Sequence, residues 1–274
     1  IWINTCYIHI RKKYTKGTIL TASRNSYKNS ALRISFTNMD ITGIYPNSTM
    51  AKNTVNLSGS SKIGKYLDGW INANYVMHEA TGRPETGYGD RNPVQKMWQW
   101  IHTSVDYKDL SEYKNPDGTQ RSWNRNAWND ASVAYTDNPY WSSNENYQSD
   151  RRDRVYGNYG LNINFAPWLK FTGRMGIDFY KMVAEERLAI GSQAQSEYFQ
   201  DVNTNNEMNS EMFLTFNKRF SDDLIGVSAL VGANRLDRKF WRNGGVTIGG
   251  LIQPKLYNLS NSLNKATVYD RLSW

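Results

Sequence analysis

Runs of alternating apolar and polar residues, each about ten residues long, recur along most of this chain. In the clearest run, Tyr159, Leu161, Ile163 and Phe165 are separated by asparagine or glycine residues. A helix would mix these side chains around its axis, whereas a strand sorts them onto two opposite faces. The pattern therefore predicts an all-β chain whose strands have one apolar face and one polar face.

Short connections join the clearest runs. A turn at Ala166–Trp168 separates the first run from a second, Leu169–Tyr180, that alternates in the same way. Two such runs with so short a link predict an antiparallel hairpin. Other alternating runs bring the expected total to about nine strands, with a weak one at Thr18–Ser23 and a partial one at the C-terminus.

The composition favours a membrane barrel over a soluble domain. Hydrophobic residues make up 39% of the chain, yet aromatic residues reach 14%, with 10 Trp and 18 Tyr. A membrane barrel needs rings at its two interfaces and polar residues in its lumen, which matches this balance. No segment approaches the roughly 20 consecutive apolar residues of a spanning helix, so insertion would require strands in a barrel.

The alternation assigns faces to the central hairpin. We expect one set of side chains to face outer-membrane lipid and the other to face the lumen. A slip of one residue in the register would exchange the two sets. The lipid-facing set is Leu161, Ile163, Phe171, Met175, Ile177 and Phe179. The lumen-facing set is Asn162, Asn164, Arg174 and Asp178.

Link lengths alternate along the chain, as in an up-and-down barrel with short periplasmic turns and longer external loops. Short turns are expected at Ile63–Tyr66, Ala166–Trp168 and Lys218–Asp223, and long links at about His78–Arg151, Val183–Asn205 and Leu236–Asn264. The predicted fold is a partial antiparallel up-and-down transmembrane β-barrel, an open curved sheet with long extracellular loops. Such a fragment has two unpaired edges and an apolar outer face, so it should require detergent.

Signatures of catalysis and of nucleic-acid binding are missing from the sequence. It contains no P-loop, G-x-G-x-x-G or G-x-S-x-G motif, and the three histidines lack metal-ligand spacing. The adjacent carboxylates Glu185 and Glu186 would point to opposite faces of a strand, unlike a glycosidase pair. The net charge is +8, but the basic residues are scattered among 25 acidic ones. We expect no enzyme activity, catalytic residue, metal, cofactor or nucleic-acid partner.

Aromatic residues concentrate in the long segment from His78 to Arg151. Rings can stack on sugars or on peptide side chains, while Asn, Asp and Arg hold hydroxyl or amide groups, but the rings could equally pack the segment onto the barrel rim. We expect this segment to be an extracellular loop that contacts substrate or a partner. The candidate contact residues are Trp98, Trp100, Trp123, Trp128, Tyr140 and Trp141.

Three stretches resemble the SusC/RagA-like TonB-dependent transporters of the Bacteroidetes outer membrane. Leu32–Ser60 is similar to a strand, a bend at Gly43–Asn47 and a returning strand of that family. Asn138–Tyr180 contains NPYW, RDRVYG and APWL in the family's order, and Gly250–Ser262 looks like an external-loop signature. The resemblance covers residues 29–274, whereas residues 1–28 match poorly.

The resemblance implies an internal piece of a barrel of about 22 strands, without the plug domain and the TonB-contacting segment. It further implies that the parent protein imports oligosaccharides or peptides across the bacterial cell outer membrane. A SusD-like surface lipoprotein would be its partner, and the TonB complex would act through the missing N-terminal region. A soluble, Trp-rich carbohydrate-binding β-domain is the alternative, which a lack of detergent dependence would favour.

Overall fold

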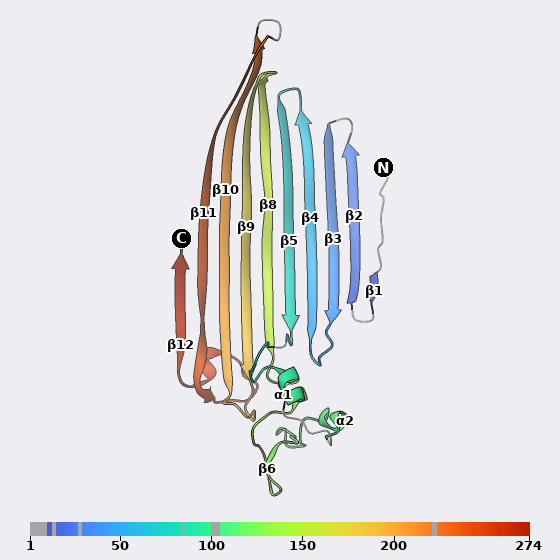
Figure 1. The fold of residues 1–274 in the computed structure, drawn as a ribbon, viewed down its shortest axis with the longest axis vertical. Coiled ribbons are helices and arrows are strands. Elements are labelled where there is room, and N and C mark those ends of the chain that lie inside the picture. The colour runs from blue at the N-terminus through green and yellow to red at the C-terminus, as the bar shows by residue number, and fades with distance from the viewer. Residues whose placement is uncertain (1–9, 13–14, 27–28, 84, 100–104, 221–223) are drawn as a thin grey trace.

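The structure is a computed structural model that describes residues 10–12, 15–26, 29–83, 85–99, 105–220 and 224–274. One antiparallel sheet dominates it, with strand order β1-β2-β3-β4-β5-β8-β9-β10-β11-β12 (Figure 1). The strands are β1 (Ile10–Lys12), β2 (Thr15–Ser26), β3 (Ser30–Thr42), β4 (Thr49–Ile63), β5 (Leu67–Thr81), β8 (Gln148–Ala166), β9 (Leu169–Leu188), β10 (Glu197–Phe220), β11 (Ile225–Leu251) and β12 (Ser262–Ser273).

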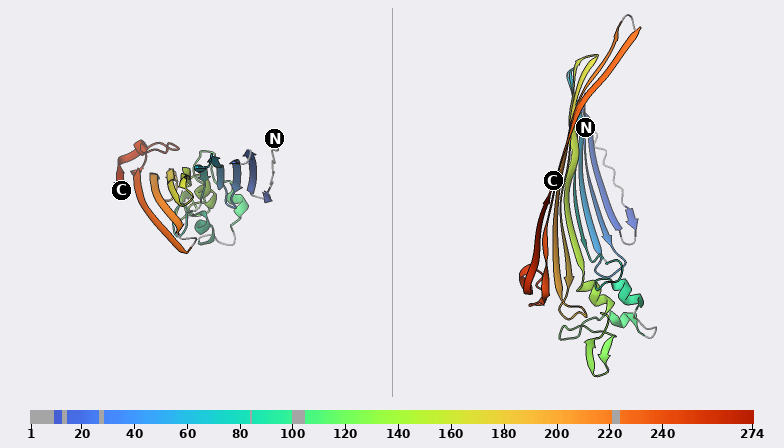
Figure 2. Two further views of the ribbon diagram at one scale, coloured as in Figure 1. Left: turned by 90° about the horizontal axis from the view of Figure 1, so that it is seen from above. Right: turned by 60° about the vertical axis from the view of Figure 1, so that its left-hand side comes forward.

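Each strand pairs with the strand that precedes it in the sheet and with the one that follows, so the sheet is an up-and-down meander. Among the described residues, β1 and β12 stand at opposite ends of the sheet, which is therefore open and is curved when seen from above (Figure 2). The expected all-β, open antiparallel sheet is confirmed, with nine long strands and the three-residue β1. The weak strand expected at Thr18–Ser23 lies within β2.

Two of the three expected short turns lie where the sequence places them. β4 ends at Ile63 and β5 begins at Leu67, while β8 ends at Ala166 and β9 begins at Leu169. β10 ends at Phe220 and β11 begins at Ile225, and residues 221–223 of the turn expected between them fall outside the described part of the chain.

The expected bounds of the long links are wrong because the strands extend further. The link expected at Val183–Asn205 is reduced to 189–196, and the one expected at Leu236–Asn264 to 252–261. β10 and β11 reach 24 and 27 residues. In their extensions both faces carry polar side chains, so the alternation stops there although the backbone pairing continues.

The chain leaves the sheet at Gly82, where β5 gives way to the longest link. Gly82 has a φ of 66°, and a Cβ there would lie 1.9 Å from the backbone oxygen of Asn47, so no other residue fits without strain. Its N–H donates to the carbonyl oxygen of Gln148 at 2.8 Å, at the point where the chain returns to the sheet in β8. Both ends of the link are thereby held together.

Candidate interaction site: the cap and the two faces of the sheet

Register divides the side chains of the central hairpin between two faces. Leu161 pairs with Gly173, and Gly160 pairs with Arg174, so Leu161 and Arg174 lie on opposite faces. The face that carries Leu161, Ile163, Phe171, Met175, Ile177 and Phe179 is called the apolar face below. The face that carries Asn162, Asn164, Arg174 and Asp178 is called the polar face.

A belt of apolar side chains crosses the apolar face. One of its borders is a register row across five strands: Phe36, Val55, Tyr75, Val155 and Phe179. Another row lies near the short turns: Ile63, Leu67, Ile163, Phe171 and Leu214. Many of these side chains are exposed, which is unusual for so continuous an apolar surface.

The belt ends sharply toward the long links. Beyond Phe179, the same face of β9 continues with Lys181, Val183, Glu185 and Arg187, and beyond Val155 the same face of β8 continues with Asp153. The apolar part of β9 covers about ten residue steps, or roughly 34 Å along the strand. With a strand tilt of about 40°, the belt would be roughly 26 Å high, close to the apolar band of about 25 Å in membrane barrels.

Aromatic rings and lysines mark the short-turn border. The Trp168 ring meets Phe216 edge to face at 5.4 Å between centroids, and Lys218 Nζ lies 5.0 Å from the centre of the Trp168 ring. Lys65 Nζ lies 5.1 Å from the centre of the Tyr66 ring. Rings with a polar tip, combined with cations, are typical of a boundary between an apolar layer and water.

Ion pairs and amides cover the polar face. Arg154 Nε donates to Asp178 Oδ1 at 2.8 Å, and Arg238 Nε donates to Glu207 Oε2 at 2.8 Å. Asp178 and Glu207 are directly opposite in the pairing of β9 with β10, so each guanidinium offsets a like-charge contact. Arg174 pairs with Glu211 on the same face. This chemistry contrasts fully with the belt on the other side of the same strands.

The longest link, residues 82–147, folds into a compact unit that we call the cap (Figure 1). Its described residues form three short helices, a hairpin and their connections, so our expectation of a single loop is wrong in this respect. The elements are α1 (Pro93–Gln99), α2 (Tyr107–Leu110), β6 (Arg125–Ala127), β7 (Asp130–Val133) and α3 (Pro139–Asn144).

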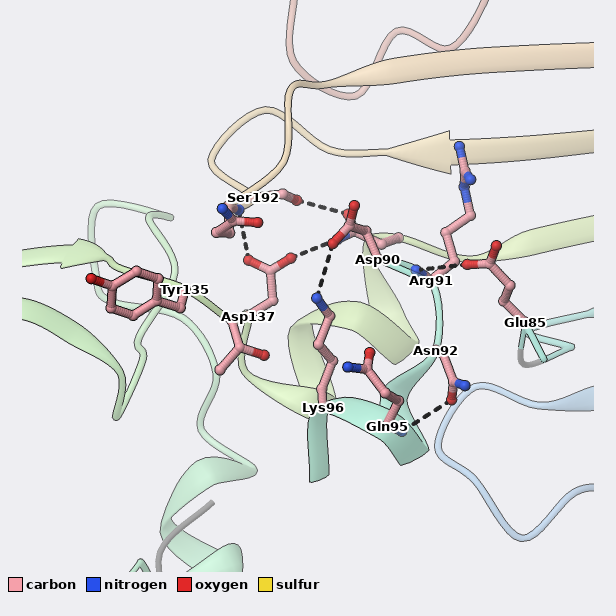
Figure 3. Close-up of polar contacts among 12 residues, drawn as sticks. Glu85, Asp90, Arg91, Asn92, Gln95, Lys96, Tyr135, Asp137 and Ser192 are labelled. Atoms are coloured by element: carbon pink, nitrogen blue, oxygen red, sulfur yellow. Dashed lines mark hydrogen bonds and ion pairs between the residues drawn. The ribbon is translucent and has the colours of Figure 1, made fainter. Parts of the chain in front are cut away.

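Buried polar residues hold the cap together, and Asp137 is at their centre (Figure 3). Its side chain is 0% exposed, and Oδ1 accepts hydrogen bonds from Gln120 Nε2 at 2.9 Å and from the backbone N–H of Gln193 at 2.7 Å. Oδ2 accepts from Asn146 Nδ2 at 3.3 Å. Burial raises the pKa of the Asp137 carboxyl, although the bonds from Gln120 and Gln193 act in the opposite direction.

Two buried asparagines extend this network. Asn138 caps α3 by accepting from the Tyr140 N–H at 2.9 Å, and its amide donates to the carbonyl oxygens of Leu110 and Arg121, each at 2.9 Å. Asn146 Oδ1 accepts from the Ala189 N–H and from Ser192 Oγ, each at 2.9 Å. The cap is thus bonded to the β9–β10 link, residues 189–196.

Charged side chains place the cap over the polar face. Arg91 donates to Glu197 at 2.8 Å and lies 3.2 Å from Glu186. Both glutamates belong to the polar face, at the ends of β10 and β9 that adjoin the long links. Within the cap, Lys96 Nζ is 2.9 Å from Asp90 Oδ1 (Figure 3).

The predicted contact residues of the cap differ in accessibility. Trp128 is 91% exposed at the turn of the β6–β7 hairpin, whereas Trp141 is 3% exposed. Trp141 Nε1 donates to Ser192 Oγ at 2.9 Å, so this ring packs the cap onto the β9–β10 link. Trp123 and Tyr140 are half-buried. Trp98 belongs to α1, while Trp100 lies outside the described residues.

Sequence reasoning missed the residues that hold the cap: Gln120, Asp137 and Asn146. The Asn138–Pro139 pair does carry a local signal, since Asn at the N-cap and Pro at the first position favour a helix start. Among the described residues, no helix has the length and apolarity to cross a bilayer. Within the same residues, no group of three or more His, Cys, Asp and Glu side chains is placed to hold a metal ion.

No protein-family model and no curated protein matches this chain. Two solved structures share its fold: that of the RagAB peptide transporter, with a TM-score of 0.67, and that of the RagAB peptide importer in the closed-closed state, with a TM-score of 0.59. Each is 13% identical and is matched over 94% of this chain. The chain spans 28% of the length of either matched chain, so the likeness is to part of a transporter and shows the fold.

Proposed function

We propose that this chain is part of the barrel wall of a SusC/RagA-like, TonB-dependent transporter in the bacterial outer membrane. The observation that carries the proposal is the apolar belt, which lies back to back with an ion-paired face on the same strands. Lipid would cover the belt, and the polar face, with Asn162, Asn164, Arg174 and Asp178, would line the lumen. The fold shared with the RagAB structures supports this assignment.

The cap would lie outside the cell. Membrane-spanning strands need about 9–11 residues, whereas β10 has 24 and β11 has 27. Most of the excess lies on the cap side of the belt, where both faces carry polar side chains, while the other border adjoins short turns. In such barrels, the side that has the longer strands and the longer links faces the cell exterior.

The cap's position over the polar face supports a place for it at the mouth of the proposed lumen. We assign it contact with substrate, with a SusD-like surface lipoprotein, or with both. The imported material would be oligosaccharides or peptides, and the structures of the RagAB peptide importer favour peptides. Coupling to the TonB complex would use a region of the parent outside this chain. The role is transport, not catalysis.

The alternative, a soluble carbohydrate-binding β-domain, is not favoured by the structure. A soluble sheet would bury one face, whereas here Phe36, Tyr75 and Leu161 on the apolar face are all exposed. A surface of this kind in water would promote association or aggregation.

Cysteine labelling tests the orientation. Cys6, the single cysteine of this chain, and any cysteine elsewhere in the native polypeptide would first be replaced by serine. Trp128→Cys then places a thiol at the tip of the cap, and Lys65→Cys is the matched control at an exposed position in a short turn. Both variants would be made in the native polypeptide that carries this sequence.

We expect a membrane-impermeant maleimide to label Trp128→Cys in intact cells and Lys65→Cys after the outer membrane is disrupted. Labelling in the reverse order would refute the orientation. Recovery of the unmodified protein in a detergent-free soluble fraction would refute the membrane assignment itself.

A further inference from the structure

A hollow of about 590 Å³ interrupts the belt on its short-turn side. Small residues form it: Ser30, Ser61 and Gly69 share one register row across β3, β4 and β5, and Gly59 lies beside Ser61 on the same face. Larger side chains, from Leu32, Ile63 and Ile71, line it as well. We call this feature the trough.

Missing side chains create the trough. A Cβ at Gly69 would meet a single neighbour within 4 Å, the backbone oxygen of Gly160 at 3.8 Å, so the space above Gly69 is open. A Cβ at Gly59 would lie 3.3 Å from Leu32 Cδ1 and 3.6 Å from Ile71 Cγ2. Larger side chains occupy the neighbouring rows, so the trough is a local depression in the belt. They are Leu32, Ile71, Tyr159 and Met175 on one side and Ile63, Leu67, Ile163 and Phe171 on the other.

The walls of the trough require no polar ligand. The hydroxyl oxygens of Ser30 and Ser61 lie 2.8 Å apart and bond to each other, so neither depends on a ligand for a partner. The remaining surface is mostly aliphatic or backbone. Lys65 lies in the adjoining turn, two residues beyond Ile63, with an exposed side chain that can reach an anionic group at the border of the belt.

We propose that the trough binds one acyl chain of a membrane phospholipid, whose phosphate is held near Lys65. The inference rests on the proposed function, because the trough is continuous with the belt that lipid would cover. An apolar hollow inside such a belt, next to a cation at its border, matches an amphiphile with an anionic head better than any wholly polar ligand. The short-turn side corresponds to the periplasmic leaflet.

Photochemical labelling in the native polypeptide tests the proposal. The protein is reconstituted into vesicles of phosphatidylethanolamine that contain a trace of the same lipid with a diazirine on its acyl chain. After illumination, labelled residues are mapped by mass spectrometry. Gly69→Leu places a branched side chain in the trough, and Gly69→Ala places a single methyl group there.

Gly176→Leu is the matched control. It adds the same side chain to the polar face of β9, where a Cβ would meet the Gly157 oxygen at 3.9 Å and nothing closer. All variants must show the wild-type shift between folded and heat-denatured mobility on a gel. If Gly69→Leu lacks this shift, Gly69→Ala takes its place, with Gly176→Ala as its control.

We expect residues 59–71 to be labelled above the rest of the belt. Gly69→Leu should reduce their labelling about tenfold, because it displaces the equivalent of about two methylene groups, while Gly176→Leu should leave it unchanged. Equal labelling around the belt that is insensitive to Gly69→Leu would overturn the trough but leave the proposed function intact. Selective labelling by a lipid A probe and not by phospholipid would overturn the choice of lipid. Absence of label from the whole belt would contradict the proposed function instead.

Discussion

Removing the Asp137 carboxylate should release the cap from the β9–β10 link. Asp137→Ala removes an acceptor from three donors: the buried Gln120 Nε2 and Asn146 Nδ2 and the part-buried Gln193 N–H. Gln120 Nε2 keeps one bond, to the Gly191 carbonyl oxygen at 3.2 Å. Asn146 cannot compensate by turning its amide, because its oxygen already accepts from the Ala189 N–H and from Ser192. Each buried N–H that loses its acceptor costs about 1–3 kcal/mol, so the loss at two buried amides should make local opening of the cap easier by about 3 kcal/mol.

Hydrogen exchange measures this opening directly. At about 1.4 kcal/mol per tenfold change, the Gln193 and Ala189 amides should exchange about 100-fold faster in Asp137→Ala. Asp130→Ala is the control, since Asp130 is an exposed acid of the same cap that bonds to Ser132 in the hairpin turn. Unchanged exchange at Gln193 in Asp137→Ala, or an equal effect in the control, would refute the role of the buried network.

Four further results are expected. Burial raises the folded-state pKa of Asp137, so the protonated carboxyl stabilises the folded cap. Protection of the Gln193 amide, corrected for intrinsic exchange, should therefore be greatest below about pH 4 and should fall as the pH rises through the raised pKa. Asp137→Asn should abolish this pH dependence. Trp141→Ala should cost the cap about 3–5 kcal/mol in local stability, whereas Trp128→Ala should change it by less than about 0.5 kcal/mol, both measured by exchange. Gly157→Ala puts a Cβ 2.1 Å from the Asn72 backbone oxygen and should lower the urea midpoint by the equivalent of about 1–3 kcal/mol, unlike Gly176→Ala. Finally, four rings of the cap would be replaced together by Ala: Trp98, Trp100, Trp123 and Trp128. This variant should insert normally but show reduced uptake and reduced co-purification of the lipoprotein partner. Wild-type uptake and co-purification in that variant would refute the contact role of the cap.

Local signals explain why most of the sheet was predictable. The alternation of Leu161 with its polar neighbours and the turn at Ala166–Trp168 depend on residues that are adjacent in sequence, and both faces of the hairpin follow from them. Where the alternation ended, prediction failed. Beyond Phe179 both faces of β9 carry polar residues, and sequence periodicity cannot distinguish a strand in water from a loop.

The cap was not predictable because long-range contacts hold it together. Asn146 bonds to Ala189, 43 residues away, and Asp137 bonds to Gln193, 56 residues away. A buried aspartate has no signature of its own in a segment rich in Asn and Asp. Trp141 and Trp128 look alike in sequence, yet one ring is packed and the other is exposed, because burial depends on which side chains the fold brings alongside.

The network divides the cap into a fixed part and a presented part. Asp137, Asn146 and Trp141 each bond to the β9–β10 link, so that part of the cap can move only together with the ends of two barrel strands. The β6–β7 hairpin is joined differently, through Asn124 at its base. Asn124 Oδ1 accepts from the Tyr135 N–H at 2.8 Å, and the backbone carbonyl oxygen of Asn124 accepts from the Ala134 N–H at 3.0 Å. These bonds fix the base and leave the tip, with Trp128, in solvent. A rigid base that presents the exposed Trp128 ring limits the entropy lost on contact, so the hairpin tip is where a substrate or partner would gain most from binding.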